Sequence, residues 1–358
     1  MFDFKAYNPL EKKRLQILSE DGTLNEALRP TELTDEKVIE LYRLMSILRA
    51  MDQKGSSLQR QGRMGTFASS YGQEASTITS TFALEEKDWV VPAYRQQGAL
   101  IVRDVPLKNF FLYYKGKESG SHYPEGSRIL PVAIPVGSQP LHGAGLGMAA
   151  KLKNDPVCAI TYFGDGASSE GETLEAMNFA GVFKANTIFF CENNQWAISI
   201  PRSKQTAAET IAQKSIAFGF DGIQIDGNDI FAVYAATRAA REKAINGGGP
   251  TLIESFTYRL SDHTSADSAK KYRDPAEVEQ WMDKEPLKRT RLYLEGKGLW
   301  DQKREDELAN EVYNLVERAV ADMEAEVAST VDEIFDYTFA ELTEPLVDQK
   351  TYLKQFFN

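Results

Sequence analysis

Between residues 157 and 259 the chain alternates strand-like apolar runs with segments of helical periodicity, and this order restricts its possible folds more than any other feature. The strand-like runs cover 157–163, 187–194, 222–226 and 250–259. The helix-like segments between them cover 170–183, 206–219 and 230–246. Alternation of this kind predicts a parallel sheet with helices packed on both faces. We therefore expect an α/β fold.

Segments before and after this region extend the domain at both ends. Upstream, the pattern predicts a long helix that begins after the Thr34 cap, further helices and one strand, at 34–63, 72–84, 88–95 (the strand), 106–116 and 141–153. Residues 1–33 lack periodicity, and we expect an arm that is ordered against a partner. From Asp274 onward the pattern is mostly helical. We divide the chain into an arm (1–33), a central domain (34–300) and a C-terminal helical extension (301–358).

Composition excludes several classes of function. The formal net charge of −11 leaves no excess of cations to neutralise nucleic-acid phosphates, so we expect no nucleic-acid partner. No apolar run reaches membrane-spanning length, and the N-terminal residues lack the apolar centre of a signal peptide. The only cysteines, Cys158 and Cys191, lie in apolar strand-like runs, where buried free thiols are expected. These features predict a soluble cytoplasmic protein without a membrane partner.

The stretch "ITYFGDGASSEG" at 160–171 raises a chemical question. Gly164 and Gly166 permit backbone angles that other residues resist, so the chain can turn sharply between a strand and a helix. Such a strand–turn–helix arrangement favours phosphate binding at the helix start. Asp165, at the tip of the turn, would repel a phosphate unless a metal ion lies between them. The carboxylate therefore suggests a metal-bound phosphate.

The next strand-like run supplies a second candidate ligand, because it ends in "ENNQW". If the two strands are parallel neighbours, Asp165 and Asn194 meet at the carboxyl edge of the sheet, where α/β folds bind ligands. Carboxylate and amide oxygens suit an octahedral Mg²⁺. Their separation, 194 − 165 = 29 positions, matches the thiamine diphosphate motif, in which Gly-Asp-Gly is followed by Asn-Asn. The alternative is that Asp165 is a helix cap and the asparagine pair a plain turn.

Other phosphate motifs fit less well. No Gly-Lys-Ser/Thr follows the turn, which excludes a Walker loop, and "HGAGLG" at 142–147 lacks the spacing of a dinucleotide fingerprint.

The surroundings of the motif resemble one family, the alpha subunit of the thiamine-dependent decarboxylating component of 2-oxo acid dehydrogenase complexes. The resemblance runs from about Leu33 to Trp300, and it implies the thiamine diphosphate-binding fold. It is carried by "RMGTFASSYGQEA", "VVPAYR", "GDGASSEGETLEAMNFAGVF", "ENNQWAISIPRSKQTAAETIAQKS", "GGGPTLIESFTYRLSDHTSADSAKKYR" and "LYLEGKGLW".

The resemblance implies a role for each matching residue. Asp165, the Asn194 side chain and the Trp196 carbonyl resemble the Mg²⁺ ligands, and Gly166 and Ala167 resemble the backbone that lines the diphosphate.

Further matching residues lie outside the Gly-Asp-Gly motif. Tyr94, Arg95 and Arg259 are similar to the groups that contact the diphosphate, for which the guanidinium fork is well suited. Ile134 and Val136 resemble the residues whose backbone contacts the aminopyrimidine ring. Ser138 and Gln139 match positions that bind K⁺ in some branched-chain enzymes.

Two of the three histidines are candidate catalytic residues. His263 follows Arg259 by four positions, as the active-site histidine of the family does; the alternative is a solvated loop residue. His122, in "SGSHYPEG", resembles another pocket histidine, and a plain loop residue is an equal alternative. We expect His142 to pack at a helix start.

The resemblance implies oxidative decarboxylation of a 2-oxo acid, with transfer of the acyl group to a lipoyl group on a dihydrolipoyl acyltransferase. The implied cofactors are thiamine diphosphate and Mg²⁺. Family members act as two alpha and two beta chains, and a beta-chain glutamate activates the cofactor. Pyruvate is the expected substrate, and branched-chain 2-oxo acids and acetoin are alternative substrates. An alternative function of a different class is that of a non-catalytic scaffold that retains the fold.

Overall fold

The computed structural model describes residues 3–327 and 330–357. Its centre is a five-stranded sheet with the strand order β1-β2-β3-β7-β6, in which every pairing is parallel. The strands are β1 (Trp89–Val91), β2 (Ala159–Gly164), β3 (Thr187–Asn193), β6 (Asp221–Asp226) and β7 (Thr251–Phe256). The predicted parallel sheet is therefore confirmed, and a separate antiparallel pair, β4 (Trp196–Ala197) and β5 (Ile200–Pro201), follows β3.

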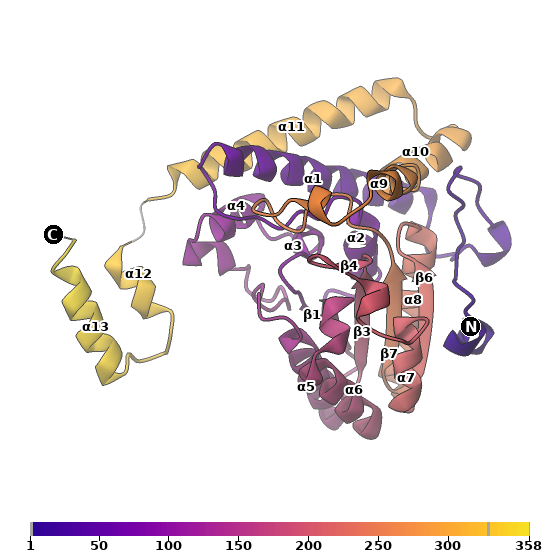
Figure 1. The fold of residues 1–358 in the computed structure, drawn as a ribbon, viewed down its shortest axis with the longest axis horizontal. Coiled ribbons are helices and arrows are strands. Elements are labelled where there is room, and N and C mark those ends of the chain that lie inside the picture. Colours follow the sequence, from indigo (N-terminus) through magenta and orange to yellow (C-terminus); the bar gives the residue numbers. More distant parts are fainter. Residues whose placement is uncertain (1–2, 328–329, 358) are drawn as a thin grey trace.

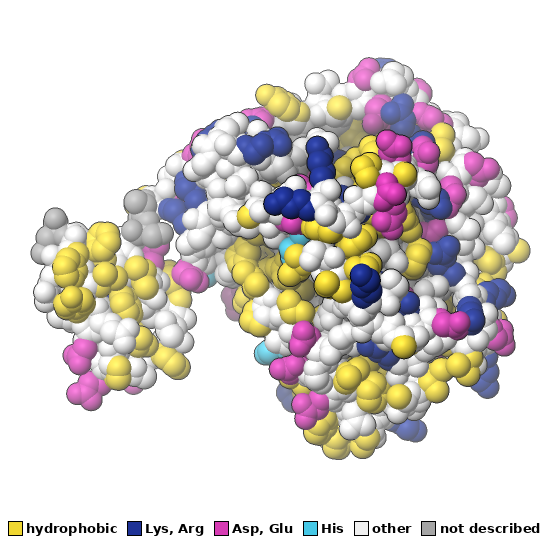
Figure 2. Space-filling model, in the orientation of Figure 1, with side chains coloured by type: hydrophobic (Ala, Val, Ile, Leu, Met, Phe, Trp, Pro, Cys, Tyr) yellow, Lys and Arg dark blue, Asp and Glu magenta, His cyan; other side chains and the backbone are white. Residues whose placement is uncertain are grey.

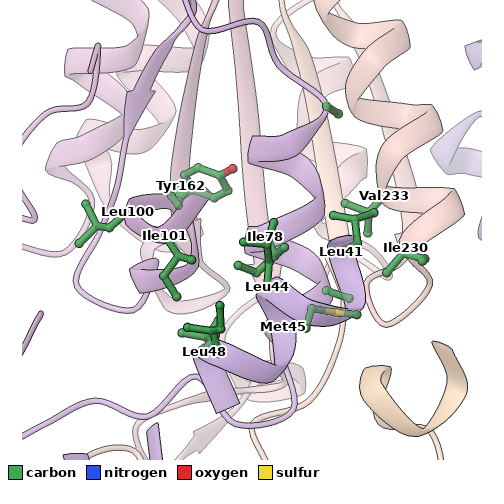
Figure 3. Packing of buried hydrophobic residues seen from close by; sticks show 14 of the residues in the cluster. Leu41, Leu44, Met45, Leu48, Ile78, Leu100, Ile101, Tyr162, Ile230 and Val233 are labelled. Carbon is green, nitrogen blue, oxygen red and sulfur yellow. The ribbon is translucent and has the colours of Figure 1, made fainter. Parts of the chain in front are cut away.

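Helices cover both faces of the sheet (Figure 1). Because successive side chains of a strand point to opposite faces, Tyr162 joins one hydrophobic cluster and Phe163 the other. The smaller cluster lies under α5 (Ser138–Lys153) and α6 (Gly171–Phe183). The larger cluster joins the opposite face to α1 (Asp35–Arg60), α2 (Glu74–Phe82), α3 (Gln97–Val102) and α8 (Ile230–Lys243). Figure 3 shows residues of these four helices in one cluster with Tyr162.

The helix α5 lies unusually close to the sheet, as its small residues predict. A Cβ placed on Gly143 would lie only 2.5 Å from the Cβ of Thr161 in β2. Glycine at this position therefore allows the close approach of α5 to the strand that carries Asp165.

The remaining helices flank this core. They are α4 (Leu107–Tyr114), α7 (Lys214–Ala217), α9 (Pro275–Met282), α10 (Pro286–Gly296), α11 (Gln302–Ala325), α12 (Val331–Asp336) and α13 (Glu344–Lys354). The helix predicted over 206–219 is wrong in its first half, because helical turns begin only at Ile211. The long α11 runs along α1 and α4, whereas α12 and α13 stand away from the body in Figure 1.

The N-terminal segment packs on its own chain, so the expectation of an arm ordered only by a partner is wrong. The Leu15 amide donates to the Gln224 carbonyl at 3.0 Å, and the Asp226 amide donates to the Leu15 carbonyl at 2.9 Å, which extends the sheet beside β6. Leu15, Ile17 and Leu18 are buried in the larger cluster. The boundaries of the three predicted segments remain predictions.

Two compositional expectations can be compared with the structure. Cys158 and Cys191 are buried and unpaired, as expected. Among the residues that the structure describes, no helix combines the length and the apolar character needed to cross a membrane.

We predict that Ile17→Ala lowers the free energy of unfolding of the purified chain, without any partner, by about 2–5 kcal/mol, because it leaves a cavity in the core. Leu10→Ala, at an exposed position of the same segment, should change it by less than about 0.5 kcal/mol. Urea denaturation measures both values. Equally small changes would mean that the segment does not dock on the isolated chain.

Candidate active site

A cavity of about 650 Å³ opens at the carboxyl ends of β2 and β3. Its lining comes from the loop after β1, the segment before α5, the turn after β2, the β4–β5 segment and the loop around His263. Most residues predicted from the sequence line this cavity: Tyr94, Arg95, Ile134, Val136, Asp165, Gly166, Ala167, Asn194, Trp196 and His263. Arg259 lies directly behind the lining, where it contacts Trp196 and His263.

Strand pairing explains why the two halves of the motif meet. In the parallel register of β2 and β3, Gly164 lies opposite Glu192. The residues that follow each strand, Asp165 and Asn194, therefore emerge at the same edge of the sheet. Both are buried and face the same cavity.

The Gly-Asp-Gly turn differs from expectation in its backbone. Neither glycine of the turn has a positive φ, and Asp165 has helical angles (φ −55°, ψ −38°). Gly166 is required for space instead, because a Cβ there would lie 2.7 Å from the Cβ of Ala197. A short 3-10 turn, Gly166–Ser169, follows, and the Lys214 ammonium donates to the Ser168 carbonyl. The backbone of this turn is thus enclosed between β4, which carries Ala197, and the segment that carries Lys214.

Asp165 is only 2% exposed, and this burial raises the pKa of its carboxyl to about 6. Its Oδ2 accepts a hydrogen bond from Gln205 Nε2 at 3.0 Å. Asn194 Nδ2 donates to Gln73 Oε1 at 2.9 Å, so Asn194 Oδ1 points the other way, where its one partner among the described residues is the Trp196 amide at 3.3 Å. The two candidate ligand side chains are thus held in defined orientations.

Two arginines beside the cavity carry buried positive charge. Arg95 is 5% exposed and Arg259 is 0% exposed, yet no carboxylate in the described part of the chain forms an ion pair with either. Arg95 donates to the carbonyls of Ser69 and His263, and Arg259 donates to those of Trp196 and Ile198. Burial and the charge of Arg95 lower the pKa of Arg259 to about 10.

Buried charges that form no ion pair are costly, so this arrangement favours an anion between the guanidinium groups, even though the Asp267 carboxylate lies near Arg259. A cation at Asp165 and a diphosphate on the arginines would offset the charges of all three side chains. The residues present therefore fit a metal-bound diphosphate, with the Gly166–Ser169 backbone as its cradle.

His263 lies between the arginines. Arg95 and Arg259 each place a guanidinium nitrogen 3.2 Å from Nδ1, so Nδ1 is the acceptor and Nε2 carries the proton. Burial and the two positive charges lower the pKa of His263 to about 4. The loop is held by Asp267, whose Oδ2 accepts from the His263 amide at 3.0 Å, and by the Tyr94 ring, which meets the imidazole edge-on.

Some predicted residues lie elsewhere. His122 is exposed, does not line the cavity and packs its ring against Tyr337 with centroids 4.8 Å apart, so its catalytic role remains a prediction. Ser138 does not line the cavity, whereas Gln139 does, and both side chains donate to the Pro135 carbonyl of their own loop. His142 lies in the first turns of α5, as expected, but its side chain is exposed and does not pack against the core.

Sequence reasoning did not identify three further polar residues at the site. Glu192 lines the cavity, accepts from Gln96 Nε2 at 2.7 Å, and burial raises its pKa to about 7. Gln73 accepts a hydrogen bond from Asn194, and Gln205 donates one to Asp165. A charged residue at the end of an apolar strand was a visible signal for Glu192, whereas the glutamines had no signal, because their partners are 121 and 40 positions away.

We predict that His263 titrates near pH 4 in the ligand-free chain and that inorganic diphosphate raises this pKa. The two arginine charges disfavour the imidazolium, and an anion that neutralises them removes much of the effect. NMR of the imidazole Cε1–H signals measures both values; because the chain has only three histidines, His122→Asn and His142→Asn assign the spectrum. A midpoint near 6.5 that diphosphate does not move would contradict the described position of His263.

Comparisons with known proteins agree with this geometry. A family model described as "Dehydrogenase E1 component" matches residues 42–332. A protein named "Pyruvate dehydrogenase E1 component subunit alpha" from Staphylococcus epidermidis is 43% identical over 355 residues, covering 98% of this chain and 96% of the relative. A protein of the same name from Staphylococcus aureus is 43% identical over 362 residues, with the same coverage of both chains. The chain therefore belongs to the dehydrogenase E1 component family.

Proposed function

We propose that this chain is the alpha subunit of a pyruvate-decarboxylating dehydrogenase and binds thiamine diphosphate through Mg²⁺. The observation that carries the proposal is the pair of buried arginines that form no ion pair with any carboxylate of residues 3–327 and 330–357, beside the buried acid Asp165. A metal-bound diphosphate offsets these three charges together, whereas a simple anion would leave the acid unpaired.

In this proposal Asp165, Asn194 Oδ1 and the Trp196 carbonyl hold Mg²⁺. Oxygen ligands of this type, together with phosphate oxygens, are those that Mg²⁺ prefers. The diphosphate would be held by the backbone of Gly166 and Ala167 and by Tyr94, Arg95 and Arg259. The aminopyrimidine ring would be held by the backbone of Ile134 and Val136, which line the same cavity. When bound, the cofactor supplies the electron sink for decarboxylation of a 2-oxo acid.

His263 is the catalytic histidine of this proposal. Its Nδ1 accepts from the arginines, so its Nε2–H is the group that can donate to an atom in the cavity. Once a diphosphate neutralises Arg95 and Arg259, the pKa of the imidazole rises towards its ordinary value near 6.5, at which it can exchange a proton at neutral pH.

A beta chain completes the site in this proposal. Ile134 and Val136 line the cavity yet are 63% and 50% exposed, which supports a second chain covering them. Figure 2 shows hydrophobic side chains exposed at the lower end of the body, the end at which Figure 1 places α5 and α6. The exposed large hydrophobic residues of these two helices include Leu152, Phe179, Val182 and Phe183. The curated relatives are named as alpha subunits, which agrees with an assembly of two alpha and two beta chains. The lipoyl domain of a dihydrolipoyl acyltransferase is the proposed acyl acceptor.

Pyruvate is the proposed substrate because the similar chains carry its name. Branched-chain 2-oxo acids and acetoin are the alternative substrates. A non-catalytic scaffold is disfavoured, because such a chain would not need to keep two buried arginines unpaired around a buried acid. We also propose a cytoplasmic location, with which buried free thiols are compatible.

The test compares the chain alone with the chain assembled with its beta partner. We predict negligible decarboxylation by the chain alone, and turnover by the complex that requires thiamine diphosphate and Mg²⁺ and is fastest with pyruvate. Rates of CO₂ release or of dye reduction with pyruvate, branched 2-oxo acids and acetoin measure this.

Matched acid variants provide the control. Asp165→Ala should lower turnover by more than about 100-fold, because even an outer partner of a metal ligand contributes about 10–100-fold. Asp155→Ala, at an exposed acid before the same strand, should leave it unchanged. Full activity of the chain alone, or of Asp165→Ala in the complex, would refute the proposal.

A further inference from the structure

Two glutamines contact the two side chains that are candidate cation ligands. Gln205 Nε2 donates to Asp165 Oδ2 at 3.0 Å, and Gln73 Oε1 accepts from Asn194 Nδ2 at 2.9 Å. Gln205 thus engages Oδ2 of Asp165 and not Oδ1, and Gln73 engages Nδ2 of Asn194 and not Oδ1, which accepts from the Trp196 amide. The same arrangement thus occurs twice, from two unrelated segments of the chain.

Each glutamine is itself held in place. Gln73 is almost fully buried at the start of α2, and its backbone N–H donates to the Ser70 carbonyl at 2.9 Å. Gln205 follows the β4–β5 pair, and its backbone N–H donates to the Arg202 carbonyl at 3.0 Å. The Arg202 guanidinium in turn donates to the Ala208 carbonyl. The backbone of each glutamine is therefore fixed, whereas Gln73 Nε2 has no hydrogen-bond partner among the described residues.

Fixed partners of this kind restrict a ligand side chain physically. A free carboxylate rotates about χ2, and a free asparagine amide can present nitrogen in place of oxygen to a cation. The hydrogen bond from Gln205 fixes the plane of the Asp165 carboxylate. The hydrogen bond from Asn194 Nδ2 to Gln73 Oε1, together with the one that the Trp196 amide donates to Asn194 Oδ1, selects the orientation in which Oδ1, and not Nδ2, points away from α2.

We propose that Gln73 and Gln205 are positioning residues that orient Asn194 and Asp165 for a divalent cation. This inference rests on the proposed Mg²⁺ site. A competing explanation makes Gln205 a substitute for the cation, one that must leave before the metal binds. The two explanations predict opposite changes in metal affinity when the amide is removed.

The experiment measures Mn²⁺ binding by electron paramagnetic resonance, in the complex with the beta chain and at saturating thiamine diphosphate. The variants are Gln205→Ala and Gln73→Met; methionine keeps the buried volume, but its thioether sulfur is only a weak acceptor for the hydrogen bond from Asn194. Gln213→Ala is the matched control, since this glutamine lies on the same segment as Gln205 but donates to the Pro9 carbonyl. Thermal unfolding without metal is recorded for every variant.

We expect Gln205→Ala and Gln73→Met each to weaken Mn²⁺ binding about 10–100-fold, as for other outer partners of metal ligands. The control should bind as the parent does, and the unfolding midpoint of Gln205→Ala without metal should be unchanged. Unchanged or tighter Mn²⁺ binding by Gln205→Ala would overturn the positioning role. Failure of the parent complex to bind Mn²⁺ would instead overturn the proposed cation site itself.

Discussion

The parallel pairing of β2 with β3 is the constraint on which the rest of the site depends. Its register sets Gly164 opposite Glu192, so that Asp165 and Asn194 leave the sheet side by side. The close approach of α5 at Gly143 packs the strand that carries Asp165. A shift of one residue would exchange the two faces of a strand and move the acid away from the amide. The candidate cation site is therefore a consequence of sheet register.

Around that edge the chain concentrates charges that it does not balance itself. Within the described part of the chain, Asp165 forms no ion pair with a basic side chain, and Arg95 and Arg259 form none with an acidic one. Arg259 nevertheless lies near Asp165 and donates to the Tyr272 hydroxyl, which donates to Asp267. Burial and the positive charges of the same two arginines lower the pKa of His263. A ligand that brings both a cation and a polyanion satisfies all of these groups, which explains why charged residues from the three segments after β1, β2 and β7 converge on one cavity.

The sequence predicts those parts of the protein that depend on local pattern. Alternating periodicity was enough for the sheet, and the spacing of Asp165 and Asn194 was enough for the core of the site. Long-range contacts were not predictable: the docking of Leu15 beside β6, the contact of Gln205 with Asp165, and the position of His122 against Tyr337 all join distant segments. The helix expected from 206 fails for a related reason, because that stretch serves as a loop that brings Gln205 to the turn.

The most direct test of the account is a crystal structure of the complex with thiamine diphosphate and Mn²⁺, in which anomalous scattering locates the metal. The account predicts one peak within coordination distance of Asp165, Asn194 Oδ1 and the Trp196 carbonyl, with the diphosphate between the metal and the two arginines. A metal bound elsewhere, or a diphosphate that leaves Arg95 and Arg259 without contact, would contradict it.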